Sequence, residues 1–232
     1  MASKSVDIET FLDPRFPSRI GKLPLQTIRT IAVIPCIIIS ILTMWKFPLS
    51  LQLMFITMLA NTFTIATTIL SVYVASVQGW KPLEKVRLWL HRSTQFTMGF
   101  QVMNILAYWA AIRRTLTVQE AYTSDPWLLL TLDFVHTFPI LCVTLNVVLS
   151  NIRFEMREFW HTSAAVAVIM LMNFVGTLIA GHPFYPNLDW QSFASVITAA
   201  TFVALFTASY VVTAFLVNLL PRQKAGEDYA SL

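Results

Sequence analysis

Long apolar runs, separated by short charged or proline-containing segments, make up most of this chain. A helix that crosses the hydrocarbon core of a bilayer needs about 20 residues. Runs of that length predict six membrane-spanning helices, which we place at residues 25–45, 48–74, 93–112, 127–150, 159–180 and 192–220. The pattern therefore predicts an all-α, polytopic integral membrane protein with a polar N-terminal tail (1–24), one six-helix domain (25–220) and a charged C-terminal tail (221–232).

Two segments next to these runs are polar enough to lie in water. Residues 1–24 contain three prolines, and residues 81–92 carry four basic side chains against one acid. Prolines interrupt helices, and charged side chains are costly inside a bilayer. We therefore expect the first segment to lie as a tail on the membrane surface, and the second to form a basic loop between the second and third spans.

The composition supports a membrane protein and excludes several other classes. The chain is 56% hydrophobic and 12% charged, whereas soluble domains carry about 25% charged residues. A net charge of +4 does not indicate nucleic-acid binding, because the basic residues flank the apolar runs instead of clustering among exposed aromatic side chains. The two cysteines lie within spans, the four histidines are scattered and glycines number only six. We therefore expect no disulfide framework, no metal site and no cofactor.

The distribution of basic residues predicts the topology. Six spans place both termini on one side, and 13 of the 16 lysines and arginines fall on that side. Membrane proteins keep basic loops in the cytosol, so both termini are expected on the cytosolic or an equivalent side. Asp7, Glu9 and Asp13 argue against a mitochondrial presequence. We expect the endoplasmic reticulum or the plasma membrane, with the mitochondrial inner membrane as an alternative.

Asp133 and His136 are the ionisable residues that lie deepest in a predicted span. They are three positions apart and share one face of the fourth helix. His136 lies about ten residues from the outer end, or roughly 15 Å, close to the midplane. Ionisable groups at that depth are costly and are candidates for function. The alternative is a structural contact between helices, or an anchor for a partner subunit.

These residues suggest acid–base chemistry. His136 is a candidate general base for a hydroxyl nucleophile. Asp133 either orients the imidazole or, if burial keeps it protonated, donates a hydrogen bond. Ser50 begins the second span on the same outer side and is the candidate nucleophile. The alternative for Ser50 is a hydrogen bond to a backbone carbonyl one turn back, which is common for serine in membrane helices.

Three short motifs, in the same order and at similar spacing, resemble the androgen-induced family of multi-span membrane proteins, which includes the androgen-dependent regulator of tissue factor pathway inhibitor. The motifs are Trp45-Lys46-Phe47 with Leu49-Ser50, Val135-His136-Thr137 with Phe138-Pro139, and Tyr185-Pro186-Asn187-Leu188. The resemblance extends from about residue 45 to residue 220.

The resemblance implies an intramembrane hydrolase of lipid esters, including fatty acid esters of hydroxy fatty acids. A threonine nucleophile and a histidine carry the reaction in the family. The histidine corresponds to His136, and the threonine corresponds to Leu49 without a gap, or to Ser50 if Pro48 is an inserted residue. The expected catalytic residues are therefore His136, Ser50 and Asp133, and the expected partners are membrane lipids and a lipid ester substrate.

Two other functions are compatible with the sequence. The first is a catalytically inactive accessory subunit or lipid-binding scaffold in a larger membrane complex, because small and polar residues in spans often mediate contacts between helices. The second is a transporter. Transporters often contain internal repeats and broken helices, and residues 25–112 and 126–220 show no convincing similarity to each other.

Overall fold

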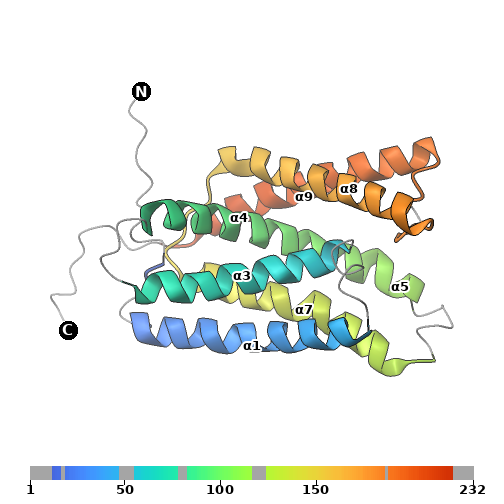
Figure 1. Cartoon of the computed structure of the whole chain (residues 1–232). Helices are drawn as coiled ribbons and strands as arrows, with labels where there is room; N and C mark the ends of the chain where they lie inside the picture. The colour runs from blue at the N-terminus through green and yellow to red at the C-terminus, as the bar shows by residue number, and fades with distance from the viewer. Residues whose placement is uncertain are drawn as a thin grey trace.

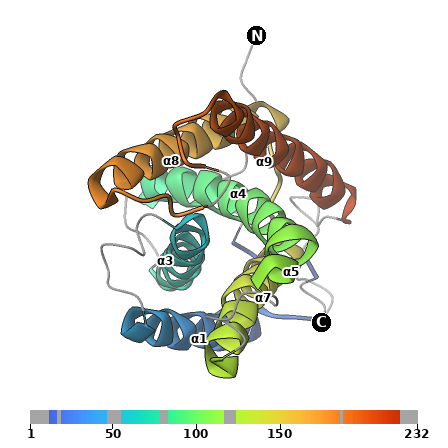
Figure 2. The same cartoon turned by 90° about the vertical axis from the view of Figure 1, so that its right-hand side faces the viewer.

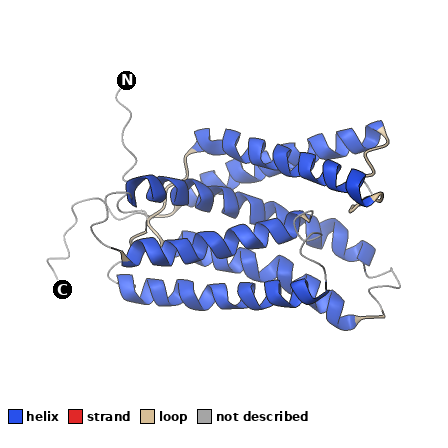
Figure 3. Ribbon diagram, viewed as in Figure 1, coloured by secondary structure: helices blue, strands red, loops and turns tan. Residues whose placement is uncertain are grey.

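The structure, a computed structural model, is a bundle of long helices (Figures 1 and 3). It describes residues 12–16, 19–46, 55–77, 83–116, 124–185 and 188–221. Within these ranges the helices are α1 (Lys22–Lys46), α3 (Ile56–Ser76), α4 (Leu83–Ala107), the π-helix η1 (Tyr108–Ile112), α5 (Arg113–Leu116), α7 (Pro126–Leu149), the short 3₁₀ helix η2 (Met156–Glu158), α8 (Phe159–Ala180) and α9 (Phe193–Leu219). The all-α prediction is confirmed for this part of the chain.

Five helices are long and apolar enough to cross a membrane. These are α1, α3, α7, α8 (together with η2) and α9. They match the first, second, fourth, fifth and sixth predicted spans. The third predicted span also forms a helix, since α4, η1 and α5 follow one another without a break. However, α4 has the lowest share of apolar side chains among the long helices and does not qualify by composition.

The polar helix α4 lies in the middle of the bundle. An end view shows α8 and α9 on one side of α4, and α1, α3 and α7 on the other (Figure 2). α4 packs against α3, α7, α8 and α9, whereas α1 packs against α3 and α7. Its buried polar side chains therefore find partners on several neighbouring helices, which offsets the cost of burying them. This position explains how a helix with so many polar residues fits inside an apolar bundle.

The bundle buries many polar side chains and exposes many large apolar ones. Large apolar side chains such as Ile41, Leu178 and Phe215 are exposed, whereas Asn61, Gln95 and other amides and hydroxyls are buried. Soluble proteins do not expose apolar surface on this scale. In a bilayer the outward side chains contact lipid, and the polar groups pair between helices. The surface therefore fits a multi-pass membrane protein.

The prediction of a loop over residues 81–92 was wrong, because α4 already begins at Leu83. This segment is a helix with one apolar face. Leu90 and His91 are buried, and Val86 packs against the main core, whereas Lys85 and Trp89 face outward. Of its basic side chains, Lys85 is exposed, whereas Arg87 and Arg92 are partly buried. Charge alone could not separate a loop from an amphipathic helix.

A glycine brings α4 and α9 into close contact. A Cβ atom built on Gly99 would lie 3.0 Å from the Cα atom of Tyr210 and 3.1 Å from its Cβ atom. The Tyr210 hydroxyl has two acceptors on this side of the bundle, Gln95 Oε1 at 2.8 Å and the Glu155 carbonyl at 2.7 Å. Small residues at such crossings let membrane helices approach closely.

Residues 12–16, part of the segment expected to be a tail on the membrane surface, pack against the end of α7. The guanidinium of Arg15 donates to backbone carbonyls at the ends of α7 and α9, namely those of Val147, Val148, Ile152 and Pro221. Pro14 pairs with Ser150 in an isolated β-bridge. A cation at a helix C-terminus satisfies orphan carbonyls and complements the helix dipole. The first and last described segments therefore meet at one end of the bundle.

Candidate functional site

A threonine and a histidine meet between α3 and α7. Thr57 Oγ1 lies 2.9 Å from His136 Nε2. Both side chains are buried, with exposed fractions of 9% for Thr57 and 5% for His136. The distance is within the range expected for a hydroxyl nucleophile paired with its general base. The structure therefore places His136, which the sequence singled out, against a hydroxyl that the sequence did not.

The contact of the other ring nitrogen, Nδ1, indicates which nitrogen of His136 carries a proton. His136 Nδ1 lies 2.6 Å from the backbone carbonyl of Leu132. A carbonyl can only accept, so Nδ1 carries a proton and donates it. In a neutral imidazole, Nε2 is then the bare nitrogen. A bare Nε2 at this distance would accept the proton of the Thr57 hydroxyl, as a general base does.

Thr57 is positioned by the start of α3. It is the second residue of that helix. The first four backbone N–H groups of a helix have no acceptor within it. The N–H of Ile56 donates to the Tyr185 hydroxyl (3.0 Å), and the N–H groups of Thr57 and Met58 belong to the same turn. The helix dipole adds positive potential there. The start of α3 therefore provides positive potential close to Thr57.

Aromatic side chains cover this end of α3. Phe55 packs edge-on against Phe184 and Tyr185, with ring centroids 5.8 Å and 5.9 Å apart. Phe184 and Tyr185 come from the segment between α8 and α9. Burial raises the pKa of Tyr185 to about 12, so its hydroxyl is neutral at physiological pH. A substrate that reaches Thr57 from this end has to displace these rings.

A tyrosine ring packs flat against the imidazole of His136. Tyr108 stacks on His136 with centroids 3.6 Å apart and an interplanar angle of 11°. The Tyr108 hydroxyl donates to Asp133 Oδ1 (2.6 Å). Asp133 also binds Arg113, with Nε 2.7 Å from Oδ1 and Nη2 3.2 Å from Oδ2. Among the described hydrogen bonds none joins Asp133 to His136; Tyr108 contacts both, because it stacks on the imidazole and donates to the carboxylate.

The π-helix η1 makes this arrangement possible. The backbone N–H of Arg113 donates to the carbonyl of Tyr108, five residues earlier. A π-turn inserts one extra residue and rotates the rest of the helix, and such turns are frequent at functional sites. Here it directs Tyr108 and Arg113 to one carboxylate, that of Asp133. The periodicity of the sequence cannot reveal such a turn.

Thr57 also ends a line of buried polar side chains. Its Oγ1 lies 3.0 Å from Asn104 Oδ1. Asn104 Nδ2 is 3.4 Å from Gln101 Oε1, and Gln101 Nε2 is 2.9 Å from Thr64 Oγ1. Asn104 and Gln101 are one turn apart on α4, and Thr57 and Thr64 are two turns apart on α3. The line therefore joins the candidate nucleophile to the interior of the bundle.

The structure brings together some predicted site residues and leaves others apart. His136 contacts the hydroxyl of Thr57. Asp133 accepts a hydrogen bond from Tyr108, whose ring stacks on His136. Ser50 lies outside the described residues. Sequence reasoning missed Thr57, Asn104 and Tyr108, because hydroxyls, amides and tyrosines are common in spans and nothing in their spacing links them to a histidine on another helix.

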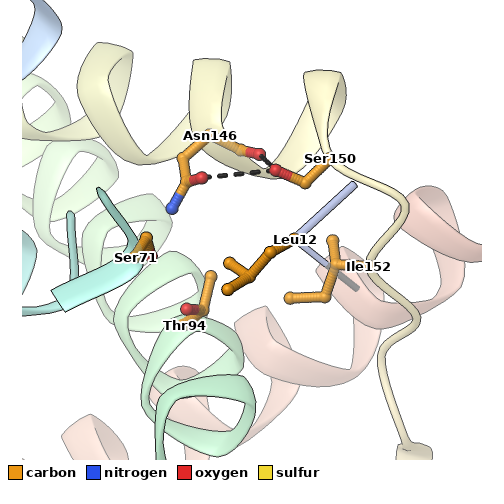
Figure 4. A pocket seen from close by; sticks show the side chains of 6 residues that line it. All are labelled: Leu12, Ser71, Thr94, Asn146, Ser150 and Ile152. Carbon is orange, nitrogen blue, oxygen red and sulfur yellow. Dashed lines mark hydrogen bonds between the residues drawn. The ribbon is translucent and has the colours of Figure 1, made fainter. Parts of the chain in front are cut away.

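Other polar groups of the bundle belong elsewhere. Figure 4 shows a narrow gap inside the bundle, lined by Leu12, Ser71, Thr94, Asn146, Ser150 and Ile152. The buried Arg29 donates to Asn146 Oδ1 (2.8 Å) and to Ser150 Oγ (2.6 Å) beside it. Asn146 is ten residues from His136 along α7, or roughly 15 Å. This cluster therefore joins α1 to the end of α7 and is separate from the Thr57–His136 pair.

Within the described ranges no three His, Cys, Asp or Glu side chains gather in a way that could hold a metal ion. A scan against protein-family models gave no match, and searches of curated proteins and of solved structures gave none either. A function is therefore inferred from the geometry of the site.

Proposed function

We propose that this protein is an intramembrane hydrolase of lipid esters, with Thr57 as nucleophile and His136 as general base. The observation that carries the proposal is the 2.9 Å contact between Thr57 Oγ1 and His136 Nε2, with Nδ1 donating to a backbone carbonyl. This is the arrangement of an activated hydroxyl. The resemblance to the androgen-induced family implies the same reaction with a threonine and a histidine, and Thr57 takes the role that the motif alignment gave to Ser50.

Acylation requires one proton to move. Thr57 Oγ1 attacks the ester carbonyl carbon while its proton passes to His136 Nε2. The tetrahedral intermediate carries negative charge on the former carbonyl oxygen, and the N–H groups in the first turn of α3 stabilise it. The C–O bond to the alcohol then breaks, and the alcohol oxygen takes the proton from His136 Nε2. The products are the alcohol and an acyl ester of Thr57.

Deacylation repeats these steps with water. His136 Nε2 takes a proton from the water that attacks the acyl carbon. The intermediate collapses, Thr57 Oγ1 leaves, and it regains its proton from His136. The fatty acid is released, and the resting pair is restored. The stacked ring of Tyr108 favours the transient imidazolium, because an aromatic face attracts a cation.

The location of the site indicates the class of substrate. Thr57 and His136 lie inside a bundle whose outer surface is apolar. A hydrophobic ester reaches such a site from the bilayer without crossing water. Fatty acid esters of hydroxy fatty acids fit, since both of their products are amphiphiles that partition into membranes. The proposal includes six spans with α4 as the third, both termini in the cytosol, and residence in the endoplasmic reticulum or plasma membrane.

The test is turnover by the purified protein in lipid nanodiscs. A fatty acid ester of a hydroxy fatty acid is included in the same nanodiscs, and the released acids are measured by mass spectrometry. We expect Thr57→Ala and His136→Ala each to abolish hydrolysis. Thr68→Ala is the matched control, because Thr68 is also a buried threonine on α3 and contacts Cys142 instead of the site.

The outcomes separate three interpretations. Hydrolysis that survives Thr57→Ala but not Ser50→Ala would make Ser50 the nucleophile and overturn the assignment of Thr57. Hydrolysis that survives His136→Ala would overturn the mechanism. If the wild type shows no turnover with any lipid ester, the polar contacts serve packing, and an inactive scaffold or accessory subunit becomes the better interpretation.

A further inference from the structure

With the side-chain amide of Asn104 oriented as described, the hydrogen bonds around Thr57 do not fit a neutral His136. The Thr57 hydroxyl has one proton, and its two neighbours are Asn104 Oδ1 and His136 Nε2. A hydroxyl donates once and accepts with its lone pairs. If the proton points to Asn104 Oδ1, then Nε2 must itself be protonated to bond to Oγ1. Because Nδ1 already donates to Leu132, the ring would be an imidazolium.

A neutral histidine requires the opposite order. Thr57 then donates to Nε2, and its second neighbour must be a donor. A half-turn of the Asn104 side-chain amide exchanges Oδ1 for Nδ2 and supplies that donor. Gln101 makes the same half-turn, so that its Nε2 donates to Asn104 Oδ1. The Thr64 hydroxyl, 3.0 Å from the carbonyl of Ala60, turns to donate to Gln101 Oε1 instead.

The two orders are complete chains that run in opposite directions. In the neutral order each group donates to the next, from Thr64 through Gln101, Asn104, Thr57 and His136 to the carbonyl of Leu132. No buried polar atom of this line is left without a partner. In the other order the donors at both ends point outward, and the extra proton sits on the imidazole. The direction of the chain is therefore coupled to the charge of His136.

The surroundings favour the neutral order at rest. An imidazolium buried in the bundle would need a nearby anion, because burying an unpaired charge is costly. The carboxylate next to it, Asp133, is already paired with Arg113 through two contacts and with the Tyr108 hydroxyl. Arg113 therefore already compensates the charge of Asp133, and the carboxylate is not left over to compensate an imidazolium at His136.

We propose that Asn104 is a further catalytic residue: its amide N–H donates to Thr57 Oγ1 and directs the hydroxyl proton to His136 Nε2. Only the catalytic part of this role rests on the proposed function. During attack the proton leaves Oγ1, and negative charge develops there until the new C–O bond forms. A donor already aimed at Oγ1 stabilises that charge without reorganisation. Gln101 and Thr64 hold the Asn104 amide in the donating orientation.

The first measurement needs no substrate. ¹⁵N NMR of histidine-labelled protein in nanodiscs at neutral pH distinguishes a protonated from a bare ring nitrogen. The signals of His136 are assigned as those lost in His136→Gln. We expect Nδ1 to be protonated and Nε2 to be bare. Protons on both nitrogens, or a proton on Nε2 alone, would overturn the inference, since Thr57 would then donate to Asn104.

The second measurement concerns turnover. Asn104→Leu removes the donor at similar size and is expected to lower kcat by about 100-fold, with a smaller change in KM, as the loss of one donor at a reacting oxygen does. Asn61→Leu is the matched control: Asn61 is a buried amide on α3 that donates to Ser40 instead of the site. A kcat within about threefold of wild type in Asn104→Leu would overturn the catalytic role.

The two measurements fail separately. A bare Nε2 together with no detectable hydrolysis by the wild type would leave the proton order in place and remove the proposed function. Hydrolysis by the wild type together with a doubly protonated ring would keep the function and remove the role of Asn104.

Discussion

The contact between α4 and α9 at Gly99 allows a quantitative test of the fold. In Gly99→Ala, the added Cβ would lie 3.0 Å from the Cα atom of Tyr210, whereas ordinary contacts of this kind are 3.4–4 Å. The obstacle is backbone and cannot turn aside as a side-chain tip can. The two helices must therefore separate by roughly half an ångström, which weakens dispersion contacts along the interface.

The expected effect is a loss of about 2 kcal/mol in the free energy of unfolding. Overpacking of this kind costs up to about 3 kcal/mol. Alanine recovers about 1 kcal/mol because it favours the helix more than glycine does. Separation of the helices also lengthens the hydrogen bonds of the Tyr210 hydroxyl to Gln95 and Glu155. The sign is therefore destabilising in spite of the better helix former.

Unfolding of the purified protein in mild detergent measures this difference. Ser209→Ala is the control at the same contact, since it removes the bond from Ser209 Oγ to the Gly99 carbonyl and adds no atoms. We expect it to cost no more than about 1 kcal/mol. If Gly99→Ala is as stable as wild type or more stable, then α4 and α9 are not in the contact described, and the central position of α4 is wrong.

Two further predictions concern the ends of the bundle. Arg15→Gln removes most of the donors that satisfy the last carbonyls of α7 and α9. We expect the free energy of unfolding to fall by about 3 kcal/mol in the same assay. Unchanged stability would contradict the packed position of residues 12–16. Asp189 accepts hydrogen bonds from Ser195 Oγ and from the Gln191 N–H, which hold its pKa below the ordinary value of 3.8. Its contribution to stability is therefore present above about pH 4 and lost as pH falls further; the fluorescence of the neighbouring Trp190 should change in that range in the wild type and not in Asp189→Asn.

Local composition was enough to predict the class of the protein and the place of one residue within a long helix. Twenty-residue apolar runs have few stable alternatives to membrane helices, so five of the six predicted spans appear as helices of sufficient length and apolarity. Counting residues along the fourth span likewise placed His136 far inside a helix. Both results depend on composition and on distance along the chain, which the sequence states directly.

The packing of the helices determines which side chains His136 meets. Thr57 on α3 and Tyr108 on η1 contact His136, and Asn104 on α4 contacts Thr57. These contacts depend on how each helix is rotated and shifted against α7. A rotation of one residue, about 100°, would replace all of them. Interior polar residues carry no mark of their partner in the sequence, because the same hydroxyl or amide serves packing or chemistry equally well.

Asp133 shows most clearly that the sequence does not reveal which side chain a buried polar residue contacts. Asp133 was visible as a costly charge in a span, yet its counter-ion Arg113 lies just beyond residue 112, where the third span was predicted to end. The π-helix at Tyr108–Ile112 turns that arginine toward the carboxylate. The sequence does not reveal this extra residue in the turn. Arg113 and Asp133 can pair only when α5 and α7, the helices that carry them, lie side by side.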